Sequence, residues 1–108
     1  MKASELAKDL DLEILNLSAA DCAVTGGYCG DLLSWVMSRA NSGDAWITVM
    51  GNINAIGVAV LADVACIILS ESASLDEDAL KKAVENDVSI FRSPLNTYSL
   101  AVEVSKRI

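Results

Sequence analysis

Residues 45–69 read AWITVMGNINAIGVAVLADVACIIL and contain the features that decide the fold. Ala45–Met50 is rich in β-branched and aromatic residues, which favours a strand. Gly51-Asn52 interrupts this run, and Ile53–Ala65 is long and apolar enough for a helix. Cys66–Leu69 is a short continuous apolar run, typical of a strand buried on both faces of a parallel sheet. The stretch therefore predicts a strand–helix–strand unit with a right-handed crossover.

The same alternation continues toward the C-terminus. Ser74 and Glu77 fit a capping box for a helix that ends near Asn86. Val88–Phe91 then predicts another strand. Ser93-Pro94 predicts the start of a last helix, with serine as the cap and proline at the first helical position.

The N-terminal part is less regular. Ser4–Leu10 has the apolar spacing of a short helix, and Leu12–Asn16 alternates weakly, as a short or edge strand does. Thr25-Gly26-Gly27 predicts a tight turn or a bulge, because adjacent glycines permit backbone angles closed to other residues. Asp31 is the expected cap of the next helix, and Gly43 the expected left-handed residue after its end.

Together these elements predict one α/β domain over residues 1–108, with a layered βαβ sheet of mainly parallel strands. The length is close to the commonest domain size. Hydrophobic residues make up 53% of the chain, which argues against disorder. Because only 5% of the residues are aromatic, we expect a core built mainly from alanine, valine, isoleucine and leucine.

The charge of the chain excludes some classes of partner. Eight basic and fifteen acidic residues give a net charge of −7, which repels nucleic-acid backbones and anionic membrane surfaces. Met1 leads directly into polar residues without the apolar segment of a signal peptide, so we expect a cytoplasmic protein. Ile53–Leu69 contains Asn54, Gly57 and Asp63, and is not expected to span a membrane.

The residues that most often carry chemistry are absent. The chain has no histidine, no glycine-rich nucleotide fingerprint and no phosphate-binding loop. Its three cysteines form no paired motif, so we interpret them as small buried apolar residues and expect no metal and no cofactor. The acidic residues form no recognisable pair, and each is interpreted as a cap or a surface charge. The sequence therefore does not predict an enzyme.

Ligands of open parallel sheets bind beyond the carboxyl ends of the strands. The polar residues expected there are Asn52, Asn54, Ser70, Ser93 and Thr97. Each predicted strand end is followed by a helix start, whose backbone N–H groups can hold an anion such as a phosphate. The alternative interpretation is that these residues only cap helices and shape turns. Thr25-Gly26-Gly27 is a second candidate, where the backbone can approach a ligand or a partner subunit closely.

Five segments, distributed over almost the whole chain, resemble stand-alone DRTGG-domain proteins. They are Val24–Tyr28, Gly30–Ser34, Gly43–Thr48, Cys66–Leu69, and Ile90–Ser93 with Thr97. The resemblance implies a fold like the N-terminal domain of HPr kinase/phosphorylase. It also implies a non-catalytic, regulatory or dimerising role, as in members attached to CBS-domain pyrophosphatases and phosphate acetyltransferases.

The chain departs from the family signature at two places. The Asp-Arg element falls where this chain has Asn52-Ile53, and the Thr-Gly-Gly element where it has Ser70-Glu71-Ser72. The Thr25-Gly26-Gly27 of this chain lies elsewhere. Serine-kinase activity does not follow from the resemblance, because the active site of HPr kinase lies in another domain with a phosphate-binding loop.

Three hypotheses for function follow. The nearly all-apolar Ile53–Ala65 helix and the resemblance favour a regulatory or interaction domain that acts as a homodimer, or that binds another protein. The alternative is a sensor of a nucleotide or another small anion at the strand ends. An enzyme of the serine-kinase type is the least favoured, since no nucleophile–base pair, metal set or cofactor loop is present.

Overall fold

Five strands form one sheet in the order β1-β5-β4-β3-β2 in the computed structural model, which describes all 108 residues. β2, β3, β4 and β5 are parallel, and β1 pairs with β5 in the antiparallel direction. The strands are β1 (Glu13–Asn16), β2 (Gly26–Cys29), β3 (Asp44–Thr48), β4 (Cys66–Leu69) and β5 (Ile90–Arg92). The predicted α/β class with a mainly parallel sheet is thus confirmed.

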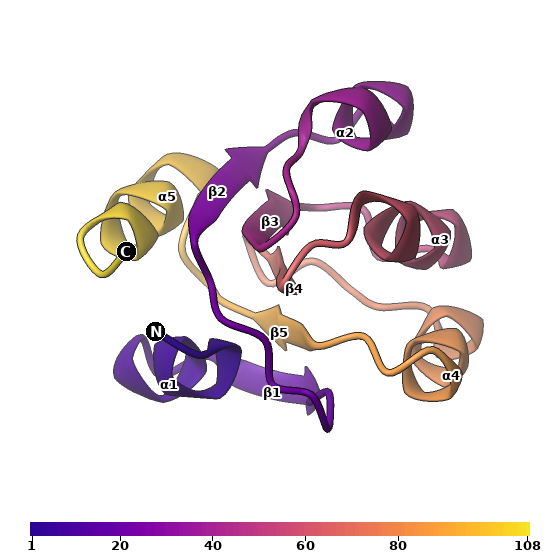
Figure 1. Cartoon of the computed structure of the whole chain (residues 1–108), viewed down its shortest axis with the longest axis horizontal. Helices are drawn as coiled ribbons and strands as arrows, with labels where there is room; N and C mark the ends of the chain where they lie inside the picture. Colours follow the sequence, from indigo (N-terminus) through magenta and orange to yellow (C-terminus); the bar gives the residue numbers. More distant parts are fainter.

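Five helices cover the two faces of this sheet (Figure 1). They are α1 (Ala3–Asp9), α2 (Leu33–Arg39), α3 (Ile53–Ala62), α4 (Glu77–Glu85) and α5 (Thr97–Ser105). α2, α3 and α4 lie side by side on one face, with α3 between the other two. α1 and α5 lie on the opposite face. Each of α2, α3 and α4 connects two parallel neighbouring strands, as in a βαβ unit.

The sheet separates the core into two apolar layers, because successive strand residues point to opposite faces. Ala45 and Ile47 of β3 pack with α1 and α5, whereas Trp46 packs with α2, α3 and α4. In β5, Phe91 belongs to the layer with α1 and α5, whereas Ile90 belongs to the layer with α2, α3 and α4. Every residue of β3 and β4 is buried, and for β4 the continuous apolar run predicts this burial.

Helix α3 ends at Ala62, three residues before its predicted end. Asp63 has φ +57°, a left-handed conformation that stops the helix. Its carboxylate accepts a hydrogen bond from the Ser42 hydroxyl across the link before β3. Aspartate tolerates this conformation better than most residues, since its short polar side chain forms local hydrogen bonds.

The turn or bulge predicted at Thr25-Gly26-Gly27 is wrong, because Gly26 and Gly27 lie in strand β2 and pair with Asp44 and Ala45. A Cβ at Gly26 would lie only 2.6 Å from an Asp44 carboxylate oxygen. Close approach to β3, rather than an unusual backbone angle, therefore favours glycine at this position, since a larger residue would require the Asp44 carboxylate to move.

Three predicted helix caps are also corrected. The Asp31 side chain bonds to the end of β3 and does not cap α2, which follows Leu32. Helix α4 begins after Asp76 rather than after Ser74. Helix α5 begins after Asn96, because the Ser93 hydroxyl accepts from the Leu95 amide in a preceding turn. The predicted left-handed conformation of Gly43 is confirmed, at φ +86°.

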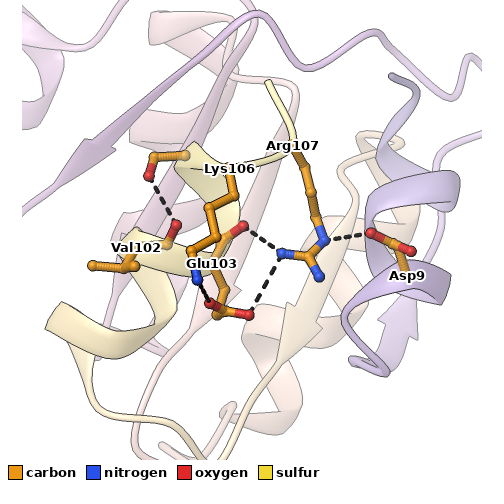
Figure 2. A network of polar contacts seen from close by, with 6 residues as sticks. Asp9, Val102, Glu103, Lys106 and Arg107 are labelled. Carbon is orange, nitrogen blue, oxygen red and sulfur yellow. Dashed lines mark hydrogen bonds and ion pairs between the residues drawn. The ribbon is translucent and has the colours of Figure 1, made fainter.

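The last turn of α5 is tied to α1 by charged side chains (Figure 2). Arg107 pairs with Asp9 of α1, and it donates to the Glu103 carbonyl at 2.8 Å. Lys106 donates to the Glu103 carboxylate at 3.0 Å, and this hydrogen bond lowers the pKa of Glu103. These contacts hold the two ends of the chain against the same face of the sheet.

The cysteines differ in their surroundings. Cys66 is buried in β4, and desolvation raises its pKa to about 12. Cys22 and Cys29 are exposed, so the prediction that all three are buried is wrong for these two. Cys29 lies at the outer edge of the sheet, where β2 has no second neighbouring strand.

Candidate functional site

The carboxyl ends of the parallel strands meet at one end of the sheet, and we call this region the strand-end site. At its β2–β3 side, one Asp31 carboxylate oxygen accepts from the Thr48 hydroxyl at 2.7 Å and from the Val49 amide at 3.0 Å. Asp31 lies just after the end of β2 at Cys29. The carboxylate thus fastens the ends of two neighbouring strands and acts as a structural acceptor.

The end of β4 carries the most unusual backbone of the chain. Glu71 and Ser72 have φ values of +57° and +53°, a left-handed region that favours glycine. Their amides donate to the Leu95 carbonyl at 2.8 Å and to the Ser93 carbonyl at 2.9 Å. The donors that could hold an anion here are therefore already bonded to the loop that follows β5.

Hydroxyl groups connect the same two loops. The buried Ser70 hydroxyl lies 2.8 Å from the Thr97 hydroxyl in the first turn of α5. Ser93 is also buried, and its amide donates to the Leu69 carbonyl at 2.8 Å. Ser70, Ser93 and Thr97 are thus brought together, and their contacts join β4 to the start of α5.

The loop after β4 also closes over the end of β3. A Cβ at Gly51 would lie 1.9 Å from the Ser74 carbonyl oxygen, so only glycine fits without movement of the backbone. The Gly51 carbonyl accepts from the Asp76 amide at 2.8 Å. Two backbone segments therefore meet directly at this contact.

The asparagines at this end have different roles. Asn52 caps α3, its side-chain oxygen accepting from the Ala55 amide at 2.9 Å. Asn54 is exposed in the first turn of α3 and has no side-chain hydrogen bond. Asn96, which the sequence did not single out, caps α5 in the same manner as Asn52. The only sequence signal for this cap is a short polar residue near a helix start, and Ser93 fits that description as well as Asn96 does.

Thr25, Gly26 and Gly27 lie at the opposite end of the sheet, where β2 begins. The two candidate sites of the sequence are therefore separate. No hollow on the surface is lined by Asn52, Ser70, Ser93 or Thr97. The backbone amides of Glu71, Ser72 and Ser93 at the strand-end site are thus all bonded within the chain, whereas the exposed side chains of Asn54, Glu71 and Ser72 form no hydrogen bond.

A hollow of about 190 Å³ lies at the end of the sheet where β4 and β5 begin. Asp63 and Asp87 line it, each in a left-handed conformation and each followed by a valine that leads into a strand. The backbone amide of Ala19 and the Ser18 hydroxyl donate to Asp87 and lower its pKa. The repeated Asp-Val pair before two strands was the sequence signal for this feature.

A second feature is the set of exposed apolar side chains on α2 and α3, which we call the α2–α3 face. Its exposed apolar residues are Trp35, Met37, Ile53, Val60 and Leu61. Leu61 is the most exposed of them, at 71%, and Trp35 is half exposed. The Arg39 guanidinium stacks on the Trp35 ring, 3.6 Å from its centroid. The sequence indicated the apolar character of α3 but not the contribution of Trp35.

No group of three or more histidine, cysteine, aspartate or glutamate side chains is arranged to hold a metal ion. None of the helices has the length and apolar character that crossing a membrane requires.

The DRTGG domain family model matches residues 5–106. No curated protein is a significant match. A similar solved structure is the regulatory region of Clostridium perfringens pyrophosphatase, with its CBS and DRTGG domains, in complex with its activator diadenosine tetraphosphate. The TM-score is 0.74 at 11% sequence identity, over 95% of this chain and 45% of the other. The chain thus spans less than half of that regulatory region, and at this identity the likeness shows the fold. Since the family match covers nearly the whole chain, the protein belongs to the DRTGG domain family.

Proposed function

We propose that the protein is a non-catalytic regulatory domain that acts as a homodimer through its α2–α3 face. Membership of the DRTGG family supports a regulatory role, since the similar DRTGG domain is part of the regulatory region of a pyrophosphatase. The strand-end site, whose backbone amides and buried hydroxyls bond within the chain and whose candidate residues line no hollow, supports a role other than catalysis.

The single observation that carries the dimer is the composition of the α2–α3 face. Helices α2 and α3 contain no carboxylate, although the chain has fifteen acidic residues. Large apolar side chains are exposed on both helices, together with a tryptophan and an arginine. Tryptophan, methionine and arginine are enriched in protein interfaces, where charged carboxylates are depleted.

Charge favours a second copy at this face over contact through other surfaces. With a net charge of −7, two copies repel each other wherever acidic surfaces meet. The α2–α3 face is a surface on which they can approach without opposing carboxylates.

The size of the protein is compatible with such an interface. A standard interface covers roughly 800 Å² on each partner. That is about 15% of the 5514 Å² surface of this chain. Two adjacent helices on one side of a molecule of this size can supply that area.

Sedimentation velocity over a concentration series, from submicromolar to 100 micromolar, tests the proposal. We expect a dimer that dissociates on dilution. Leu61→Ser should weaken it at least about tenfold, because Leu61 loses its apolar contact with the partner. Leu61 is 71% exposed, so the fold itself should lose little stability.

Leu17→Ser provides the matched control, because Leu17 is also exposed, at 41%, but lies in the loop after β1. It should leave the dissociation constant unchanged. A monomer at every concentration, or equal effects of the two substitutions, would show that the proposed interface is wrong.

The second candidate is a sensor of a nucleotide or another small anion at the strand-end site. The observation that favours it is the nucleotide activator in the complex of the C. perfringens regulatory region. Against it, the amides of Glu71 and Ser72 already donate to backbone carbonyls. Binding there would require the loop after β4 to separate from the loop after β5.

Thermal unfolding with 5 mM ATP, inorganic phosphate or diadenosine tetraphosphate distinguishes the two candidates. A ligand at about 100 times its dissociation constant adds roughly 2.7 kcal/mol to the free energy of unfolding. Stabilisation that Thr97→Val removes would favour the sensor. The absence of any shift with all three compounds would leave the regulatory homodimer as the function. ATP-dependent phosphate transfer in the same samples would contradict the non-catalytic role.

A further inference from the structure

The three helices on one face of the sheet form an ordered layer. α3 contacts α2 on one side and α4 on the other. All three run in the same direction, because each returns between two parallel strands. Their C-terminal ends therefore lie at the same end of the sheet, where the strands begin. Arg39 is the last residue of α2, and Glu85 is the last residue of α4.

A homodimer that packs α3 on α3 can use one of two symmetry axes. An axis perpendicular to α3, in the plane of the interface, places α2 opposite α2 of the partner. An axis parallel to α3 places α2 opposite α4 of the partner, with the two helices in the same direction. Both arrangements are isologous, so every contact occurs twice. The charges on the outer helices decide between them.

Helix α2 contributes one charge to this layer, the Arg39 guanidinium. Arg92 and Arg107 each form an ion pair with a carboxylate, whereas Arg39 forms none. Stacking on Trp35 fixes the plane of the guanidinium and leaves its N–H donors without a carboxylate. An arginine held in this way is ready for a carboxylate from another molecule.

Helix α4 carries the opposite charge. Its acidic residues are Glu77, Asp78 and Glu85, and its basic residues are Lys81 and Lys82. Lys82 leans onto α3, where its ammonium nitrogen lies 3.8 Å from the position of a Cβ at Gly57. Glu85 is exposed and forms no ion pair within the chain. The C-terminal end of α4 therefore offers a free carboxylate at the level of Arg39.

We propose that the twofold axis of the homodimer runs parallel to α3, so that Arg39 of each copy pairs with the partner's Glu85. The inference rests on the homodimer proposed above and extends its interface from α2 and α3 to α4. The perpendicular axis would instead make the facing helices antiparallel, so that Arg39 meets the start of the partner's α2, where there is no carboxylate, and the acidic residues at the two ends of α4 face those of the partner's α4. Like charges in those positions repel, whereas the parallel axis makes two complementary pairs.

Charge reversal tests this arrangement. Arg39→Glu replaces attraction by repulsion in both symmetric pairs, and we expect the dissociation constant to rise roughly 30-fold. Glu85→Arg should have a similar effect. The double variant Arg39→Glu/Glu85→Arg should restore the dimer to within about threefold of the original, since the two charges are exchanged. Lys8→Glu is the control, as Lys8 is exposed on α1 at the opposite face.

The outcomes separate the two proposals. A dimer that Leu61→Ser weakens but that Arg39→Glu and Glu85→Arg leave intact would overturn the parallel axis and keep the homodimer. A protein that is monomeric before any substitution would overturn both. Weakening by each single variant without recovery in the double variant would also overturn the pairing. Circular dichroism of each variant confirms that the fold is retained.

Discussion

Glu71 and Ser72 test whether the backbone after β4 has a conformation that favours the glycines of the family signature. Two consecutive residues other than glycine adopt φ values of +57° and +53° after β4. The sequence resemblance places the two glycines of the Thr-Gly-Gly signature at these positions. Both side chains are exposed and neither forms a hydrogen bond, so replacing them by glycine removes no contact. We predict that Glu71→Gly and Ser72→Gly each stabilise the protein.

The magnitude follows from two opposing effects. A left-handed conformation costs an ordinary L-residue about 1–2 kcal/mol, which glycine avoids. Glycine costs roughly 0.5–1 kcal/mol in return, because its unfolded chain is more flexible. Taking the middle of each range, the net gain is about 0.75 kcal/mol at each position, or about 1.5 kcal/mol for the double variant. In a domain of this size, the Tm of the double variant should rise by roughly 4–12 °C.

Urea unfolding followed by circular dichroism measures these gains, with thermal unfolding as a second readout. Ser74→Gly is the matched control, because Ser74 lies in the same loop but does not have a positive φ. It should lower the free energy of unfolding by roughly 0.5–1 kcal/mol. If Glu71→Gly and Ser72→Gly destabilise the protein as much as Ser74→Gly does, the explanation by backbone conformation is wrong.

Three further predictions concern other parts of the chain. Gly51→Ala should destabilise by about 1–3 kcal/mol in urea unfolding, because its Cβ would lie 1.9 Å from the Ser74 carbonyl; unchanged stability would contradict that close approach. Hydrogen bonds from Arg92 and Lys106 lower the pKa values of Glu13 and Glu103 in the folded protein. The charged carboxylates therefore stabilise the folded state at pH values above the ordinary glutamate pKa, and this stabilisation is lost as the pH falls. The free energy of unfolding should therefore fall as the pH drops from about 5 to 3, and Glu13→Gln/Glu103→Gln should show a shallower dependence. Iodoacetamide should modify Cys22 and Cys29 in the native protein but modify Cys66 only in denaturant, as mass spectrometry can count; modification of Cys66 in the native state would contradict its burial.

The central strands could be predicted from the sequence because short, strongly apolar runs are typical of strands that are buried on both faces of a parallel sheet. Cys66–Leu69 is buried along its whole length, and its four consecutive apolar residues predict this burial. Strand β2 could not be found in the same way. Its Gly26-Gly27 pair carries no side chains, and its pairing is set by β3, which lies more than fifteen residues away. Long-range pairing of this kind leaves little local signal.

The position of the strand-end site could be predicted from the sheet topology, but the hydrogen bonds that its backbone amides form could not. Parallel strands placed Ser70, Ser93 and Thr97 at one end of the sheet, as expected. Whether their neighbours offer free amides depends on hydrogen bonds between two loops far apart in the sequence. The cap of α5 could not be predicted for a different reason. Ser93 and Asn96 are both short and polar, and Ser93 instead forms a local turn in which its hydroxyl accepts from the Leu95 amide, so that the helix begins after Asn96.

The Arg107–Asp9 contact has a consequence for how the domain can be connected to other chains. It joins the last turn of α5 to the end of α1, and both ends of the chain lie on that side of the sheet (Figure 1). A polypeptide can therefore enter and leave the domain at neighbouring points, so that inserting it into a loop of a host protein separates the two flanks only a little. The same proximity allows the original ends to be fused by a short glycine–serine linker and new ends to be opened at Ser42. Such a circular permutant should retain the sheet order, with the entropy of the linker as its main cost.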